Sequence, residues 1–96
     1  MNKNYIYILT NANNSVLYVG VTSNLHERIE QHRRLEVGFT ARYNLTKLIY
    51  VEQHSDIRSA IEREKQLKSW SRKRKDDLIA KSNPLWKDLF CEIKEE

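Results

Sequence analysis

Two segments near the N-terminus, residues 5–10 and 16–21, consist almost entirely of aliphatic, β-branched and aromatic residues. Such runs are typical of β-strands, and the polar residues 11–15 between them, with an Asn-Asn pair that tolerates positive φ, predict a hairpin loop. Because apolar residues occupy both faces, we expect both strands to lie centrally in a covered sheet. In this register Tyr7 and Tyr18 are diagonal neighbours on one face.

A helix is expected directly after the hairpin, over residues 25–34. Asn24 followed by Glu27 three residues later resembles a capping box, which marks a helix start. The apolar positions of this helix share one face with His32, and Arg28 flanks that face. Both polar side chains are therefore predicted to point toward the sheet.

The rest of the chain alternates once more between strand and helix. Residues 37–44 are expected to form a loop, and residues 47–52 a third strand. Ser55 is expected to cap a helix that has Asp56 in its first turn and runs to about Trp70. Ser71 is expected to start a second helix, to about Lys81. Asn83-Pro84 is expected to open a short third helix through Phe90. The order is β-β-α-β-α-α(-α), an α+β fold.

Length and composition limit the class of protein. With 96 residues, 40% hydrophobic and 31% charged, we expect a single folded domain over residues 1–96. Two glycines and one cysteine exclude glycine-rich nucleotide-binding loops and a disulfide framework. The longest apolar run, residues 5–9, is too short for a membrane span or a secretory signal. The expectation is a cytoplasmic protein without a membrane partner.

Basic residues concentrate in residues 58–75, although the net charge of the whole chain is only +4. This segment holds eight lysines and arginines against two glutamates and includes the run Arg72-Lys73-Arg74-Lys75. A local excess of this kind is expected of a phosphate-binding surface. Charge alone leaves a solvated helix face equally open.

Glu64 is the most informative single residue. In the expected helix it falls near the middle of the apolar stripe formed by Ile57, Ala60, Ile61 and Leu67. A carboxylate there is costly unless it is paired or binds a cation. One interpretation is an i, i+4 ion pair with Lys68. The other is a carboxylate for Mg²⁺, which needs only one or two protein carboxylates when water and phosphate complete its shell.

The remaining candidates each have a structural alternative. Tyr7 and Tyr18 are either core aromatics or phenols beside a phosphate site, and His32 is either a hydrogen-bonded core histidine or a proton carrier. Arg28 suits bidentate phosphate binding but is also compatible with a solvated position. Asn83 is explained by capping. The three histidines lack a zinc-binding spacing.

In their order along the chain, these residues resemble the motifs of the GIY-YIG nuclease superfamily. The resemblance covers roughly residues 4–89 and is closest to its small stand-alone bacterial members. It is carried by Tyr5-Ile6-Tyr7, Tyr18-Val19-Gly20, Arg28 and His32, Glu64 in Arg63-Glu64-Lys65-Gln66-Leu67-Lys68, and Asn83 in Asn83-Pro84-Leu85-Trp86. Two positions depart from the pattern: Tyr5 replaces the glycine of the first motif, and Val19 replaces the isoleucine of the second.

The resemblance implies a three-stranded, mainly antiparallel sheet flanked by helices and metal-dependent hydrolysis of phosphodiester bonds. It implies that Glu64 holds one Mg²⁺ or Mn²⁺ ion and that Arg28 neutralises the scissile phosphate. Tyr7 would act as general base or orient the attacking water, with Tyr18 and His32 assisting proton movement. Nucleic-acid contacts are expected from Lys68, Arg72, Lys73, Arg74, Lys75 and Asn83.

The implied substrate is DNA, which the protein would cut with structure selectivity or weak sequence specificity. The implied role is in DNA repair or recombination, and a protein partner is a possible source of specificity. Two other classes stay open at this point. One is a nucleic-acid-binding module of the same fold without catalysis. The other is a structural partner-binding domain, which would leave Glu64 and the basic segment unexplained.

Overall fold

The computed structural model describes residues 3–93. The elements are β1 (Asn4–Thr10), β2 (Leu17–Thr22), α1 (Leu25–Arg33), α2 (Gly38–Arg42), β3 (Lys47–His54), α3 (Ile57–Ser69), α4 (Arg72–Ser82) and a 3-10 turn, η1 (Phe90–Glu92). The predicted α+β class and the order of strands and main helices are confirmed.

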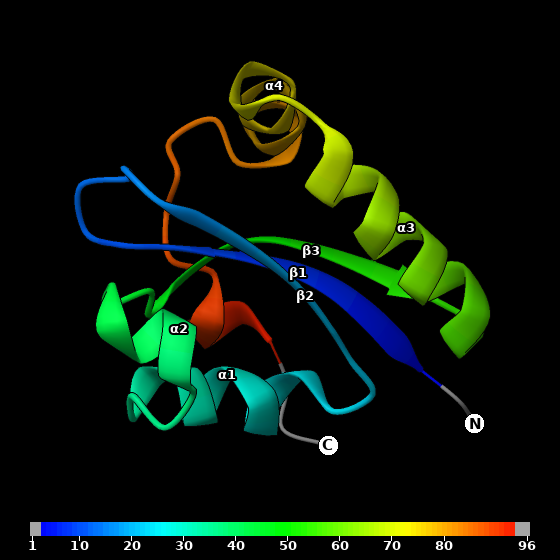
Figure 1. Cartoon of the computed structure of the whole chain (residues 1–96), viewed down its shortest axis with the longest axis horizontal. Coiled ribbons are helices and arrows are strands. Elements are labelled where there is room, and N and C mark those ends of the chain that lie inside the picture. Colours follow the sequence, from blue (N-terminus) through cyan, green and yellow to red (C-terminus); the bar gives the residue numbers. More distant parts are fainter. Residues whose placement is uncertain (1–2, 94–96) are drawn as a thin grey trace.

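The three strands form one antiparallel sheet in the order β2-β1-β3 (Figure 1). The central position of β1 is as expected, but the prediction for β2 is wrong, because β2 is an outer strand. The face of β2 that carries Leu17, Val19 and Val21 packs under α3, in one cluster with Ala60 and Leu67. The hairpin register pairs Tyr7 with Gly20 and Leu9 with Tyr18. The two tyrosines are therefore diagonal neighbours, as predicted.

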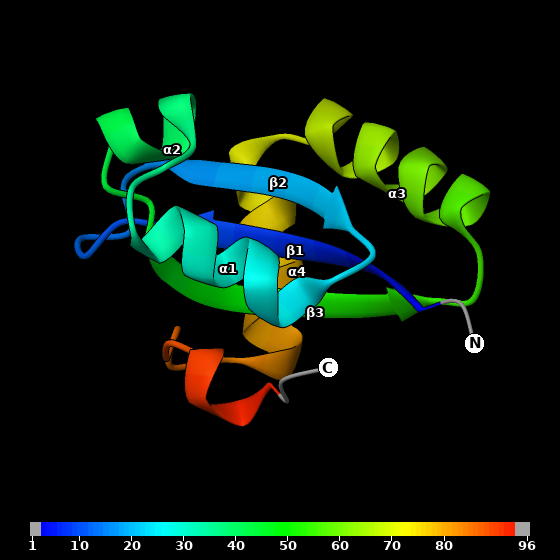
Figure 2. The ribbon, with the colours of Figure 1, turned by 90° about the horizontal axis from the view of Figure 1, so that it is seen from below.

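Helices cover both faces of the sheet (Figure 1). On one face α3 and α4 enclose a core that includes Ile6, Ile8 and Leu67. On the other face α1, α2 and the C-terminal segment enclose a second core around Tyr7 and Ile29. Seen from below, α3 runs alongside β2 rather than over the middle of the sheet (Figure 2).

Two predicted boundaries are wrong in the middle of the chain. Residues 37–44 contain the short helix α2, which the buried Thr40 fixes against the fold. Helix α3 is capped by Asp56 rather than Ser55, because the Asp56 carboxylate accepts a hydrogen bond from the Ser59 backbone nitrogen at 2.9 Å. The cap of α4 at Ser71 is confirmed.

The predicted terminal helix from Asn83 through Phe90 is also wrong, since only the turn η1 is helical there. Trp86 has φ of 52°, a left-handed conformation that interrupts a helix. The segment instead crosses β3, where the Leu89 backbone nitrogen donates to the Leu48 carbonyl at 2.7 Å. Within residues 3–93 no helix is long and apolar enough to cross a membrane.

Candidate active site

Tyr7 lies at the centre of a cluster formed by both strands of the hairpin and by α1. It is 1% exposed, and its hydroxyl oxygen lies 2.8 Å from Nε2 of His32. The ring centroids of Tyr7, Tyr18 and His32 are 5.5–6.3 Å apart. The two tyrosines and the histidine thus share one face of the sheet.

His32 is fully buried and is hydrogen-bonded at both ring nitrogens. Its Nδ1 lies 2.7 Å from the hydroxyl oxygen of Thr40, which itself donates to the Val37 carbonyl at 3.1 Å. Burial lowers the pKa of His32 to about 4, and the nearby Arg28 guanidinium adds to this effect. The imidazole is therefore neutral near pH 7.

Thr40 is a site residue that sequence reasoning missed. It lies in the segment predicted as a loop, and neither its spacing nor its neighbours distinguish it from other threonines. Only α2, which brings Thr40 against α1, reveals its contact with His32.

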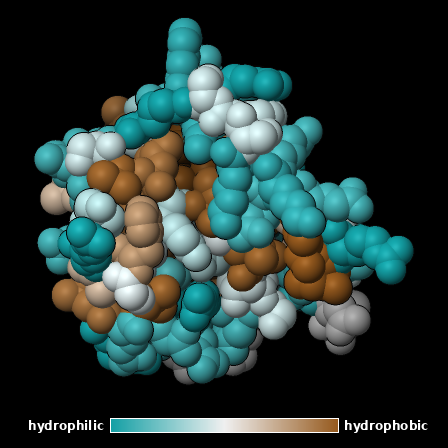
Figure 3. Space-filling model, in the orientation of Figure 1, coloured by the Kyte–Doolittle hydropathy of each residue, from teal (hydrophilic) through white to brown (hydrophobic). Residues whose placement is uncertain are grey.

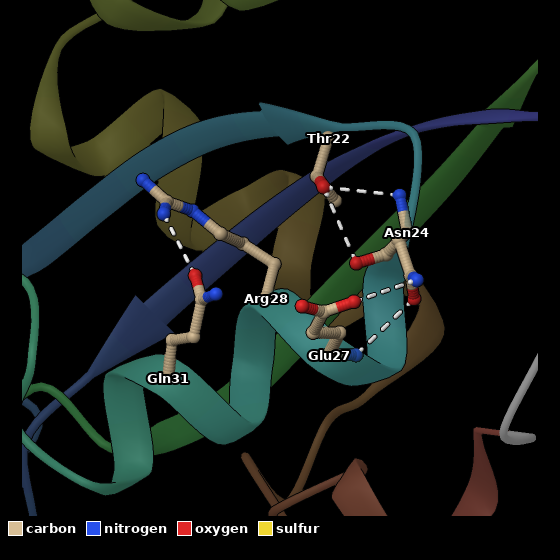
Figure 4. Close-up of a pocket in the computed structure, with 5 residues that line it drawn as sticks. All are labelled: Thr22, Asn24, Glu27, Arg28 and Gln31. Carbon is tan, nitrogen blue, oxygen red and sulfur yellow. Dashed lines mark hydrogen bonds between the residues drawn. The ribbon is translucent and has the colours of Figure 1, made fainter.

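Arg28 lies one turn before His32 and points from α1 across toward β2 (Figure 4). Its guanidinium donates to the Gln31 side-chain oxygen at 3.0 Å. Both residues line a cavity of about 210 Å³. Asn24 also lines this cavity and is the predicted N-cap, since its side-chain oxygen accepts from the Glu27 backbone nitrogen and its side-chain nitrogen donates to the Glu27 carboxylate. The backbone nitrogen of Asn24 donates to the Thr22 hydroxyl at 3.1 Å instead of to Glu27, so the capping box is only partly formed. The cavity thus presents an arginine fork beside the tyrosine–histidine cluster.

The ionisation of Tyr7 reflects this whole neighbourhood. Burial raises the pKa of the Tyr7 hydroxyl to about 12. The Arg28 guanidinium opposes the rise, whereas Tyr18 and the Glu64 carboxylate add to it. In the absence of substrate the phenol is therefore protonated at neutral pH. These three groups come from separate elements, α1, β2 and α3.

Glu64 reaches this cluster from α3. Its side chain is 18% exposed, and its Oε2 lies 3.4 Å from Nζ of Lys68, so the i, i+4 ion pair considered from the sequence is present. Lys68 in turn lies 5.9 Å from the ring centroid of Tyr18. The predicted position in the middle of an apolar stripe is wrong, because Ile57 is 49% and Ile61 37% exposed. Glu64 lies at the margin of the buried stripe, beside β2.

A divalent cation is the cofactor that the sequence resemblance implies, and the donor set decides which kind fits. Within residues 3–93 no group of three or more His, Cys, Asp or Glu side chains comes together. Glu64 offers carboxylate oxygen only, in a partly open position. A hard cation such as Mg²⁺ or Mn²⁺ takes one protein carboxylate and completes its shell with water and phosphate, so Glu64 fits it.

The basic run of α4 does not form one continuous surface. Arg72 donates to the Asn14 and Ser15 carbonyls of the hairpin loop and pairs with Asp76, while Lys73 pairs with Asp77. The Arg74 guanidinium stacks 4.1 Å from the centroid of Trp70. A helix spreads consecutive residues over its circumference, so these side chains point in different directions. Their contacts with nucleic acid stay a prediction.

Lys75 and Lys68 lie on the side that faces the cluster. They line a groove of about 250 Å³ together with Tyr18 and Phe39, at the outer edge of β2. Hydrophilic side chains dominate the surface over α3 and α4, and hydrophobic ones are exposed between these helices and α2 (Figure 3). This groove, the Lys68–Lys75 groove, leads away from the tyrosine–histidine cluster.

Asn83 is brought to a different place. It is 3% exposed, its side-chain nitrogen donates to the Ile49 and Lys87 carbonyls, and its side-chain oxygen accepts from the Lys87 backbone nitrogen. Its polar atoms are thus used to fasten the C-terminal segment to β3. This geometry gives Asn83 a structural role, and the nucleic-acid contact expected from the sequence stays a prediction.

Comparisons with known proteins agree on one family. Residues 3–77 match the GIY-YIG catalytic domain. The UPF0213 protein of Syntrophus aciditrophicus is 36% identical over 86 residues, which cover 88% of this chain and 97% of that protein. UPF0213 protein SH2523 of Staphylococcus haemolyticus is 37% identical over 83 residues, which cover 82% and 96%.

A solved structure shows the same fold. The solution NMR structure of the UPF0213 protein BH0048 from Bacillus halodurans aligns with a TM-score of 0.58 and 23% identity, covering 90% of this chain and 92% of that one. With the matched catalytic domain and the relatives of similar length, the chain belongs to the GIY-YIG family, a nuclease superfamily.

Proposed function

We propose that this protein is a divalent-metal-dependent endonuclease that hydrolyses phosphodiester bonds of DNA. The observation that carries the proposal is the convergence of Tyr7, Tyr18, Arg28, His32 and Glu64 from four elements on the β2 side of the sheet. A binding module needs positive charge on its surface but has no use for a buried phenol hydrogen-bonded to a neutral imidazole. Hydrolysis needs both an anion-binding group and a route for a proton.

Tyr7 would orient the attacking water and accept its proton while passing its own hydroxyl proton to Nε2 of His32. The 2.8 Å contact supports this transfer, because it lies within hydrogen-bond reach. The lowered pKa of His32 keeps the imidazole neutral and able to accept. Tyr18 packs beside both rings and would restrict their movement.

Arg28 would bind the scissile phosphate with its planar guanidinium and stabilise the charge that grows in the transition state. Glu64 would hold one Mg²⁺ or Mn²⁺ ion. When bound, such an ion neutralises phosphate charge and acidifies coordinated water. The Lys68 ammonium, which is 52% exposed, can turn from Glu64 toward a phosphate.

Substrate binding would extend from the cluster into the Lys68–Lys75 groove, whose two ammonium groups suit a DNA backbone. With so few basic groups at this surface, we propose selection of DNA structure rather than of a long sequence. Such selectivity suits repair or recombination, with a protein partner as a further source of specificity.

The test is a cleavage screen of branched, nicked, single-stranded and duplex DNA with Mg²⁺, Mn²⁺ or chelator. We expect cleavage that requires the metal. Arg28→Ala should lower kcat by more than about 10²-fold with little change in KM, because its charge acts mainly in the transition state. Arg28→Lys should recover only part of that loss, since an ammonium lacks the planar fork.

Arg34→Ala is the matched control, because it removes an exposed arginine from the end of the same helix. It should cleave like the wild type. Metal-independent binding without cleavage on every substrate would favour the non-catalytic DNA-binding module instead. Full activity of Arg28→Ala would remove Arg28 from the mechanism.

A further inference from the structure

We propose that Thr40 is a positioning residue that fixes the tautomer of His32, so that Nδ1 carries the proton and Nε2 presents its lone pair to Tyr7. This inference rests on the proposed function, since it assigns Thr40 a part in the proton route of the same site. No motif residue supplies this contact; α2 brings it from outside the pattern that identifies the family.

The direction of each hydrogen bond follows from the last acceptor in the series, the Val37 carbonyl. The Val37 carbonyl can only accept, and it lies 3.1 Å from the Thr40 hydroxyl, so the hydroxyl proton is donated to it. The Thr40 oxygen then has only lone pairs left for Nδ1 of His32 at 2.7 Å. Nδ1 must therefore carry a proton.

A neutral imidazole carries one proton, and the low pKa of His32, about 4, keeps the ring neutral near pH 7. With the proton on Nδ1, Nε2 is an acceptor, and the Tyr7 hydroxyl at 2.8 Å donates to it. Three bonds in series thus point from Tyr7 through His32 and Thr40 to a backbone carbonyl. The opposite tautomer would bring the lone pair of Nδ1 against those of the Thr40 oxygen at 2.7 Å.

The hydrogen bond between Thr40 and His32 is held rigidly enough to constrain the tautomer of His32. Thr40 and His32 are both fully buried, so water cannot replace the hydroxyl. The Val37 carbonyl is itself fixed by the Ala41 backbone nitrogen at 2.7 Å, and the Leu45 nitrogen donates to the Thr40 carbonyl at 2.8 Å. When Tyr7 passes its proton to Nε2, the imidazolium forms with Nδ1 still bonded to Thr40, and no atom has to move first.

The experiment measures the His32 tautomer directly by ¹⁵N NMR of the imidazole in the protein alone, at pH 7. The wild type should show the Nδ1-protonated form. Thr40→Val keeps the shape but removes the hydroxyl, and should lose the preference for that form. Thr40→Ser keeps the hydroxyl and should retain it. In the cleavage assay Thr40→Val should lower kcat by about 10–100-fold, the loss seen when a metal-bound histidine loses the group that fixes its tautomer, with KM unchanged.

The NMR outcomes test the tautomer assignment independently of whether the protein is a nuclease. An Nε2-protonated wild type, or an unchanged tautomer in Thr40→Val, overturns it whatever the protein cleaves. A shifted tautomer with unchanged kcat overturns the catalytic relevance of Thr40. A wild type with the expected tautomer but no cleavage on any DNA would contradict the proposed function and leave the tautomer assignment supported. If Thr40→Val does not fold, the wild-type and Thr40→Ser spectra still test the assignment.

Discussion

Gly20 lies directly opposite Tyr7 in the β1–β2 ladder, and the ring of Tyr7 lies over it. A Cβ atom on residue 20 would come within 2.4 Å of both the Cζ and the hydroxyl oxygen of Tyr7. The backbone of Gly20 does not have positive φ. The glycine is therefore required by the close approach of the phenol, and the two motif residues form one packing unit.

Gly20→Ala should consequently displace the Tyr7 ring and break its hydrogen bond to His32. Overpacking at a buried site costs about 1–3 kcal/mol of unfolding free energy, and cleavage should fall with the lost geometry. Gly38→Ala is the control, since a Cβ there meets no atom within 4 Å. Urea denaturation of both variants checks the prediction, and equal stabilities would contradict it.

His32 should make the stability of the protein depend on pH. Its folded pKa of about 4, caused by burial and then by Arg28, lies below the ordinary value of 6.5. The unfolded chain therefore binds the proton first as pH falls, so the stabilisation is complete above about pH 6.5 and is lost toward pH 4. The size of the effect is about 3 kcal/mol.

Urea denaturation between pH 7 and pH 4 measures this loss in the wild type and in His32→Gln, in which it should be absent. His26→Gln is the control, because His26 lies on the same helix but packs against Glu30 and the Phe90 ring rather than against the Tyr7 cluster. It should keep the wild-type profile. A His32→Gln profile parallel to that of the wild type would show that His32 does not titrate below its ordinary range.

Local rules were sufficient for much of the fold. The caps at Asn24 and Ser71 and the register of Tyr7 against Tyr18 depend on residues that are close in sequence, and all three predictions are confirmed. Glu64 shows the limit of this reasoning. Helical periodicity places Ile57 and Ile61 on one stripe, but it contains no information on where the helix lies relative to the sheet.

Because α3 runs beside β2, only part of the predicted stripe is buried, and Glu64 occupies its margin (Figure 2). The same limitation explains why the sequence does not reveal the contact of Thr40 with His32 or the contact of Arg72 with the hairpin loop. Their partners, His32 and the Asn14 carbonyl, are distant in sequence. Tertiary contacts of this kind leave no local pattern.

The basic residues should separate into two groups in binding experiments. Lys75→Gln removes a charge from the Lys68–Lys75 groove and should reduce the salt dependence of DNA affinity by about one unit of the log–log slope, the effect of one phosphate contact. Lys73→Gln, which removes an 86% exposed lysine of the same helix, is the control and should leave the slope unchanged. Fluorescence anisotropy at several salt concentrations measures both slopes.

Arg72→Gln should behave differently from both lysine variants. It removes the guanidinium that joins α4 to the Asn14 and Ser15 carbonyls, so it should lower stability by about 1–3 kcal/mol while the slope changes little. An unchanged slope in Lys75→Gln together with a reduced slope in Arg72→Gln would show that DNA follows the hairpin loop rather than the groove.

Glu64→Gln tests the proposed metal ligand by a measurement that does not require cleavage. The Glu64–Lys68 pair is partly exposed and weak, so its loss should change the stability of the metal-free protein by less than about 1 kcal/mol. With Mn²⁺ at ten times its Kd, the wild type should gain about 1.4 kcal/mol, or roughly 6–11 °C in Tm. The variant should gain nothing, because the carboxylate that distinguishes the folded from the unfolded chain is gone.

Glu62→Gln is the matched control, since Glu62 is an exposed carboxylate two residues away on the same helix. It should keep the wild-type response to Mn²⁺ and the wild-type cleavage. DNA binding by Glu64→Gln should persist or tighten, because a negative charge near the phosphate has been removed, whereas cleavage should be lost. A purely structural Glu64 makes the opposite prediction: Glu64→Gln would melt earlier without metal, respond to Mn²⁺ like the wild type and still cut DNA.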